Sequence, residues 1–305
     1  NRWSFYITNK TGEDEKENFM KQYLDVLKEI LENGEDQPNR TGMDARVLFV
    51  EQLRFDLEKG FPAMTTKQLA WQATKGELLC FLKAERDVNV FRKHQCKFWD
   101  GNAEADYWKN RAAFPGDLGR IYGVQWRKWL SPRLVSIFAG VPSYKVEEVD
   151  QIATLIKTLR EDPYNRRLVV SAWNPGELDQ MSLPACHMLF ECHVTNKKEL
   201  KLCMVQRSCD MFLGVPINIA SYALLTHMLA QVTGLKAKEL VIILINAHIY
   251  NNHLGQVREQ LSRHPYPLPT LWLNPEVKNI DDFKMDDIRL ENYKHHPPIK
   301  ALMAV

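Results

Sequence analysis

The 305-residue chain lacks the patterns that mark several common classes of protein. Its longest uninterrupted apolar run, Leu240 to Ile245, is far shorter than the roughly 20 residues that cross a membrane. The N-terminus has no apolar signal-peptide core, and a net charge of +2 indicates no basic surface for nucleic acid. We therefore expect a cytoplasmic protein whose partners are neither a membrane nor a nucleic acid.

Metal-binding and nucleotide-binding signatures are also missing. The six cysteines form no CxxC pair, and no spacing of cysteine and histidine indicates a metal site. No GxGxxG or Walker motif is present. We expect reduced thiols, no bound metal and no doubly wound nucleotide-binding fold.

The apolar periodicity predicts one α+β domain, residues 19–305, behind a flexible polar N-terminal extension, residues 1–18. Residues 94–146 have no clear period and are expected to form loops with short helices, and residues 265–305 are rich in proline and loops. The predicted helices are 20–31, 67–83, 147–161 and 216–232; the predicted strands are 47–50, 53–57, 168–173, 188–194, 200–206 and 240–250.

Cys186 is the strongest candidate for a catalytic residue. Its run Leu183–His187 is followed about twenty residues later by a cation, a hydroxyl and a carboxylate in Arg207–Asp210, and Arg166 and Arg167 precede it. Positive charge lowers a thiol pKa and makes the thiolate nucleophile available. The alternative is a small buried hydrophobic residue, which is what most cysteines are.

An ordered set of motifs gives a more specific interpretation, because together they resemble the thymidylate synthase family from about Met20 to the last residue. The matching segments are Asn39–Gly42, Thr65–Lys67, Glu77–Leu79, Trp99-Asp100, Asp117–Gly119, Tyr122-Gly123, Arg166-Arg167, Ser171–Pro175, Leu183–His187, Gln206–Tyr222, Ala247–Tyr250 and Met303–Val305.

The resemblance implies a fold and a reaction. The family fold is a large twisted mixed β-sheet packed with helices, with one sheet face forming an obligate homodimer. The reaction is the reductive methylation of dUMP to dTMP, with 5,10-methylenetetrahydrofolate as the source of both the one-carbon unit and the hydride. Cys186 is expected to add to C6 of the uracil ring, which turns C5 into a nucleophile.

The resemblance also implies roles for particular residues. Glu77 would organise water and relay protons at uracil O4, and Tyr122 would help remove the C5 proton. Asn218 offers both a donor and an acceptor, which suits uracil, whereas an aspartate would suit cytosine. The alternative for an asparagine at this position alone is a residue that caps or packs the start of a helix. His187 is expected to be structural.

Two further groups follow from the same motifs. The dUMP group comprises Arg40, Arg207, Ser208, Asn218, His248 and Tyr250 with Arg166 and Arg167 donated by the partner subunit. The folate group comprises Lys67 at the glutamate tail, Asp210 at the pterin, Trp99, Leu213 and Gly214 as walls, and Ala304 and Val305 as a closing tail. Taken singly, His248 would be a buried structural histidine, and Arg166-Arg167 a solvated turn.

The chain departs from the family pattern at several positions. These are Met43–Arg46 after the first motif, Cys80, Glu191 and Ile245-Asn246, and the segment Leu134 to Tyr144 matches no family motif. A deoxyuridylate hydroxymethylase, which uses the same thiolate but adds water, stays open as an alternative. So does a catalytically silent nucleotide-binding homologue, although Cys186, Glu77, Tyr122 and Asn218 together argue against it.

Overall fold

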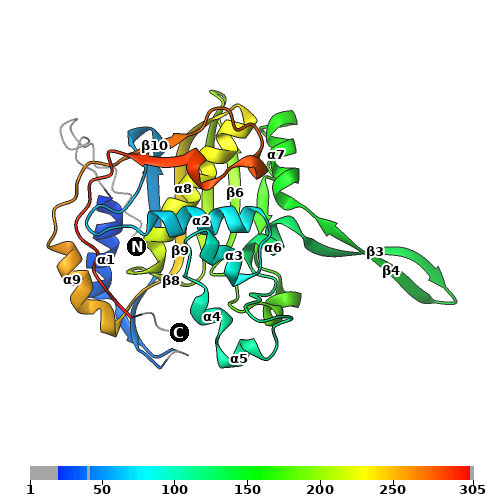
Figure 1. Cartoon of the computed structure of the whole chain (residues 1–305), viewed down its shortest axis with the longest axis horizontal. Coiled ribbons are helices and arrows are strands. Elements are labelled where there is room, and N and C mark those ends of the chain that lie inside the picture. The colour runs from blue at the N-terminus through cyan, green and yellow to red at the C-terminus, as the bar shows by residue number, and fades with distance from the viewer. Residues whose placement is uncertain (1–19, 40–41, 303–305) are drawn as a thin grey trace, which may run out of the picture.

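A mixed seven-stranded sheet forms the centre of the chain in the computed structural model, which describes residues 20–39 and 42–302 (Figure 1). Its strands are β1 (Glu35–Gln37), β2 (Ala45–Asp56), β5 (Val169–Ser171), β6 (His187–Val194), β7 (Glu199–Gln206), β8 (Cys209–Asp210) and β9 (Lys236–Tyr250). The predicted single α+β domain with a large mixed sheet is confirmed. The predicted extension 1–18 lies outside the described residues.

The order of strands is β1-β2-β9-β7-β6-β5, with β8 pairing beside the end of β9. The last long strand, β9, lies in the middle, antiparallel to β2 and parallel to β7. The two predicted strands 47–50 and 53–57 are one strand, because β9 pairs with both in a single register on either side of Val50. Val50 has a φ of 62°, so the strand has a local kink close to the point where the sequence predicted two separate strands.

Helices lie on one face of this sheet, either directly against its strands or against one another. They are α1 (Lys21–Asn33), α2 (Trp71–Leu82), α3 (Val88–Lys93), α4 (Asp100–Ala103), α5 (Asp106–Lys109), α6 (Tyr122–Arg127), α7 (Gln151–Glu161), α8 (Gly214–Thr233) and α9 (Leu254–Leu261). The apolar helix α8 is buried between the sheet strands β7 and β9 and the helices α2 and α7. Core-facing Leu202, Met204 and Ile242 are almost fully buried, so α8 and the sheet together form the core.

The other face of the sheet is partly exposed. Pairing registers place one row of side chains across it, from Arg54 through Val241, Cys203 and Glu191 to Val169. Glu191 and Val169 in this row are exposed and Cys203 is half-buried. The departure at Glu191 therefore lies on this open face and not in the core.

The largest difference from the sequence prediction is a β-hairpin, β3 (Trp129–Phe138) and β4 (Val141–Val149), where loops and short helices were expected. Figure 1 shows it projecting far from the body of the molecule. Its two-residue turn is Ala139-Gly140, and both residues have positive φ. Such turns usually carry Asn-Gly or Asp-Gly, so alanine concealed the signal. Helix α7 consequently begins at Gln151, capped by Asp150, and not at residue 147.

The remaining C-terminal segment runs over the surface with little regular structure, as predicted. It contains the small antiparallel pair β10 (Thr270–Leu273) and β11 (Ile288–Glu291), and short 3-10 turns.

Close packing of α2 against α6 gives a test of the fold. A Cβ at Gly123 in α6 would lie 2.3 Å from the Phe81 carbonyl oxygen of α2. Gly123→Ala must therefore push apart two helices, and we expect it to lower the free energy of unfolding by about 1–3 kcal/mol. Thermal unfolding followed by circular dichroism measures the effect.

Gly255→Ala is the matched control, because a Cβ there meets nothing within 4 Å in helix α9. Alanine is a better helix former than glycine, so this variant should unfold at the same temperature as the wild type or higher. Equal melting temperatures for the two variants would contradict the packing of α2 on α6.

Candidate active site

A cavity of about 240 Å³ lies where α2, α6 and the first turn of α8 meet the ends of the central strands. Among the described residues, Cys186 is the cysteine that lines it. The predicted residues brought together in its wall are Glu77, Trp99, Tyr122, Cys186, Ser208, Asp210, Leu213, Gly214, Asn218, His248 and Tyr250. Residues up to about 170 positions apart in sequence thus share one cavity.

Cys186 stands on a tight segment directly before β6. The Arg207 backbone N–H donates to the Cys186 carbonyl at 2.8 Å. The Arg207 guanidinium donates to the carbonyl oxygens of Ala185 at 2.9 Å and Pro184 at 2.8 Å. One arginine therefore holds three consecutive carbonyls. These bonds keep the segment of the predicted nucleophile in place, and they keep the positive charge of Arg207 near it.

Tyr122 contacts this segment from the opposite side. Its phenol oxygen accepts a hydrogen bond of 2.6 Å from the Cys186 backbone N–H. Burial, reinforced by the charge of the Cys186 thiolate, raises the pKa of Tyr122 well above its ordinary value. Tyr122 therefore stays a phenol whose own O–H is available to donate toward the cavity.

Glu77 is a buried carboxyl on α2 that accepts a hydrogen bond of 2.8 Å from Trp99 Nε1. Burial raises its pKa to about 7, and the Trp99 bond opposes part of this shift. A carboxyl that titrates near neutral pH can both give and accept a proton. Glu77 thus has the properties required for the proton relay that the motifs predict.

Asn218 projects from the first turns of α8 and is fixed by two neighbours. Gln206 Nε2 donates to Asn218 Oδ1 at 3.1 Å, and Asn218 Nδ2 lies 3.0 Å from His187 Nε2. Burial lowers the pKa of His187 to about 3. The neutral ring can therefore accept from Asn218, while Nδ1 lies 3.3 Å from the hydroxyl of Tyr222. The amide orientation is set before any ligand binds, and His187 is one of the two side chains that set it.

His248 is oriented by the residue that departs from the family pattern. Its Nδ1 lies 2.8 Å from Asn246 Oδ1 and 3.1 Å from the Asn246 carbonyl. Both partners are oxygens, so Nδ1 donates and Nε2 is left as an acceptor. Burial lowers the pKa of His248, which keeps the ring neutral. Asn246 therefore still holds this side chain in place without a negative charge.

A second hollow of about 310 Å³ adjoins the first, since Ser208, His248 and Tyr250 line both. Arg207 and Asn39 also line it. The guanidinium of Arg207 still has N–H donors beyond the two that bind the carbonyls. This hollow can accept an anionic group attached to a ring in the first cavity. Arg40, predicted for the same role, lies outside the described residues.

The predicted folate residues divide into two sets. Asp210 Oδ1 accepts hydrogen bonds from the backbone N–H groups of Phe212 and Leu213, and within the described residues its Oδ2 accepts none. Lys67 does not line the cavity: it is buried, its ammonium donates to the Phe212 carbonyl, and it lies 3.5 Å from the centroid of the Phe212 ring. Burial lowers its pKa to about 8.

The cavity does not contain the predicted arginine pair. Arg166 and Arg167 are exposed in the segment between α7 and β5, and neither guanidinium is paired within the part of the chain that the structure describes. Ala304 and Val305 lie outside the described residues. The backbone carbonyl of Leu302, just before them, lies 2.7 Å from His253 Nε2.

Sequence reasoning assigned no role to five residues that line the cavity: Phe98, Asn102, Leu183, Gln206 and Ile217. A signal for Gln206 was present, because it follows the core-facing positions Leu200, Leu202 and Met204 at the same period of two. Because a buried polar side chain is costly without a hydrogen-bond partner, a glutamine at such a position indicates a structural or functional contact. No comparable pattern marks Asn102.

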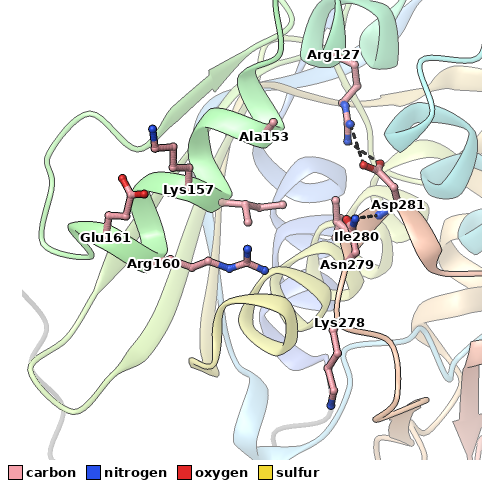
Figure 2. A pocket seen from close by; sticks show the side chains of 10 residues that line it. Arg127, Ala153, Lys157, Arg160, Glu161, Lys278, Asn279, Ile280 and Asp281 are labelled. Atoms are coloured by element: carbon pink, nitrogen blue, oxygen red, sulfur yellow. Dashed lines mark hydrogen bonds and ion pairs between the residues drawn. The ribbon is translucent and has the colours of Figure 1, made fainter.

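Another cavity, of about 420 Å³, lies between α7 and the segment Lys278–Asp281. Figure 2 shows that its charged groups do not converge: Arg127 is turned to Asp281, and Lys278 points away from the space. Arg127 Nη1 lies 2.9 Å from Asp281 Oδ1, so this cation is already neutralised. We assign no chemistry to this cavity.

The described residues, 20–39 and 42–302, contain no group of three or more histidine, cysteine, aspartate or glutamate residues arranged to hold a metal ion. None of their helices has the length and apolar character needed to cross a membrane.

The raised pKa of Glu77 predicts a pH-dependent stability. The ordinary value is 4.5 and the folded value is about 7, so between these two pH values the folded chain binds more protons than the unfolded chain. Stability therefore falls as the pH rises through this window. Glu77→Gln removes the titration, and we expect it to lose less stability than the wild type between pH 5 and about 8, by on the order of 3 kcal/mol.

Denaturant unfolding of both proteins at a series of pH values measures this difference. Parallel stability curves for wild type and Glu77→Gln over the whole range would contradict the buried, titrating carboxyl.

Comparison with known proteins agrees with the geometry. The family model described as thymidylate synthase matches residues 21–305. A thymidylate synthase of Malacoplasma penetrans (strain HF-2) is 46% identical over 306 residues, which covers 94% of this chain and 100% of that protein. The resemblance inferred from the ordered motifs is thus confirmed, and the chain belongs to the thymidylate synthase family.

Proposed function

We propose that this chain is a methyltransferase that converts dUMP to dTMP and produces dihydrofolate from 5,10-methylenetetrahydrofolate. The observation that carries the proposal is the convergence of Cys186, Tyr122, Glu77 and Asn218 on one cavity. A nucleophile, a phenol, a carboxyl that titrates near pH 7 and an amide are the groups that this chemistry needs at one ring.

The first step is addition of the Cys186 thiolate to C6 of the uracil. The C5–C6 double bond opens, its electrons move toward C5 and O4, and a C6–S bond forms. Arg207 supports this step by holding the segment Pro184–Cys186 and by placing a cation near the sulfur. The same arginine faces the second hollow, where it binds the 5′-phosphate with Ser208.

The base is chosen by Asn218. Its Oδ1 has a second lone pair and its Nδ2 a second N–H beyond those used by Gln206 and His187. These face the uracil N3–H and O4, respectively. Cytosine has an acceptor at N3 and an amino donor on C4. The fixed amide would therefore place its acceptor against an acceptor and its donor against a donor. His248 Nε2 and Tyr250 bind the ribose hydroxyl.

The cavity wall also fits a folate. Trp99, Phe98, Leu213 and Ile217 provide an apolar wall for a flat ring system, and Asp210 Oδ2 is an acceptor for the N–H groups of a pterin. Bound methylenetetrahydrofolate supplies the one-carbon unit and then the hydride. The buried site keeps water from competing with that hydride.

Lys67 is a weaker candidate for the folate tail than the motifs imply. Its ammonium is committed to the Phe212 carbonyl, directly beside Asp210 and Leu213. We therefore infer that Lys67 acts mainly by positioning the segment that contacts the pterin.

Proton transfers fall to Glu77 and Tyr122. Glu77 exchanges a proton with O4 through water as negative charge develops and disappears there. Tyr122, whose oxygen accepts from the Cys186 N–H, directs its own proton toward the cavity and orients the water that takes the proton from C5. Burial raises the pKa of both groups, so near neutral pH Tyr122 keeps its proton whereas Glu77 can release and regain one.

The functional unit is a homodimer formed through the open face of the sheet. Support comes from the half-buried and exposed row across β2, β9, β7, β6 and β5, and from two arginines that are unpaired within the described chain. Arg166 and Arg167 lie in the segment that leads into β5, at the edge of that face. From there they reach the phosphate in the partner's site.

A product assay tests the proposed reaction. Wild type given dUMP and methylenetetrahydrofolate should form equal amounts of dTMP and dihydrofolate. Cys186→Ala should bind dUMP but form no product, because the nucleophile is missing, whereas Cys203→Ser should turn over normally because that thiol lies on the other face of the sheet.

Hydroxymethyl-dUMP with tetrahydrofolate as products would instead identify a hydroxymethylase. No turnover by the wild type, with dUMP still bound, would indicate a silent homologue.

Mixing of two inactive variants tests the shared site. Arg166→Ala/Arg167→Ala and Cys186→Ala should each be inactive, yet a mixed dimer has one site with both the thiol and intact partner arginines. Random exchange of subunits should restore roughly a quarter of wild-type activity. A mixture that stays inactive after verified subunit exchange would show that the arginines act within their own subunit.

A further inference from the structure

The β3–β4 hairpin is the one element of the described chain that extends away from the body (Figure 1). In this hairpin Leu134, Ile137, Tyr144 and Val146 are each more than half exposed. An isolated two-stranded hairpin is marginally stable in water. A hairpin with this many exposed apolar side chains is therefore expected to be covered by another surface.

The pairing register sorts the hairpin into two different faces. Residues directly opposite each other share a face, and the pairs Pro132↔Val146, Leu134↔Tyr144 and Ile137↔Pro142 all fall on the same one. The irregularity between Leu134 and Ser136 keeps this face in phase along the hairpin. We call the face formed by these six residues the apolar arm face.

The opposite face is polar over most of its length. It carries the pairs Ser131↔Glu147, Arg133↔Lys145 and Ser136↔Ser143, and only at the tip the apolar pair Phe138↔Val141. Arg133 and Lys145 each lie within 4 Å of Glu147, at 3.7 Å and 3.6 Å. The hairpin is therefore amphipathic, with charges satisfied on one side and no charge among the six residues of the other.

The edges of the hairpin are poor sites for a further strand. Each strand contains one proline, Pro132 in β3 and Pro142 in β4. A proline in a two-stranded ladder lies where the backbone N–H would point outward. The edge therefore lacks a hydrogen-bond donor at that position, which disfavours pairing with a further strand. The surface available for binding is thus the apolar arm face and not the backbone edges.

The size of this face indicates its occupant. It exposes on the order of 500 Å² of apolar surface, at the upper end of the largest patches on monomeric proteins. Two such faces packed together bury roughly 1,000 Å², which is the lower limit for a specific interface. A two-fold axis sets the same patch against itself. The six residues carry no charge that would repel the copy, and the nearest charge on this side, Glu148, lies beyond them opposite Leu130.

We propose that the apolar arm face binds the apolar arm face of a second copy of this chain, so that two hairpins pack face to face across a two-fold axis. A second copy is present at the same concentration as the chain itself, which provides the permanent cover that the hairpin needs. The contact lies outside the catalytic cavity and does not depend on the proposed reaction.

Photo-crosslinking tests the contact directly. Tyr144→p-benzoylphenylalanine places a crosslinker on the apolar arm face, and Ser143→p-benzoylphenylalanine places it one residue away on the polar face. In an equimolar mixture of isotopically labelled and unlabelled protein, the first variant should give mixed-label peptides that join the hairpins of two copies. The second variant should give few or none.

Crosslinks from position 144 to the body of the molecule, or none to another copy, would overturn the proposal. A lysate protein captured in place of a second copy would overturn it too, in favour of a different partner.

A shortened hairpin provides an independent measurement. Replacing residues 134–144 by Asn-Gly closes the Arg133↔Lys145 pair with a favoured two-residue turn. Sedimentation velocity should show that assembly of this variant beyond the sheet-face dimer is weaker by about tenfold or more, with unchanged turnover. Identical association of wild type and shortened protein at every concentration would contradict the arm contact, and loss of turnover would show that the fold had been damaged.

Discussion

The hydrogen bonds of Arg207 to the segment before β6 are the constraint on which the catalytic arrangement depends. One residue binds the carbonyl oxygens of Pro184, Ala185 and Cys186 through its guanidinium and its backbone N–H. Its position is set in turn by β7, which ends at Gln206 and pairs with His187 at the start of β6. The location of the thiol is therefore a consequence of strand pairing.

The other proposed catalytic groups are held by residues at the same two strand ends. Gln206, at the end of β7, donates to Asn218, and His187, at the start of β6, lies against the other end of that amide. Tyr122 stacks on His187 with ring centroids 4.3 Å apart and accepts from the Cys186 N–H. The proposed nucleophile, phenol and base-selecting amide are thus linked through His187, Tyr122 and the Cys186 backbone.

Much of the fold could be predicted, but not its pairing. Periodicity located α8 and the strands β6, β7 and β9 within a few residues. It could not show that the last strand enters the middle of the sheet, because pairing partners are chosen by long-range packing. Periodicity also missed the β3–β4 hairpin. Its apolar side chains do not follow one regular alternation, because the register shifts between Leu134 and Ser136, and its turn is Ala139-Gly140 instead of the usual Asn-Gly or Asp-Gly.

The sequence by itself determined the family, because the order of the motifs along the chain matches it, and it predicted the nucleophile segment and most residues of the cavity. The tertiary structure decided which of these groups can act and how. It buried Glu77 until its pKa rose to about 7, turned Lys67 inward to Phe212, left Arg166 and Arg167 outside the cavity, and brought Gln206 to Asn218. The physical reason is that burial and hydrogen-bond partners arise only from contacts between distant segments, which no local pattern of residues encodes.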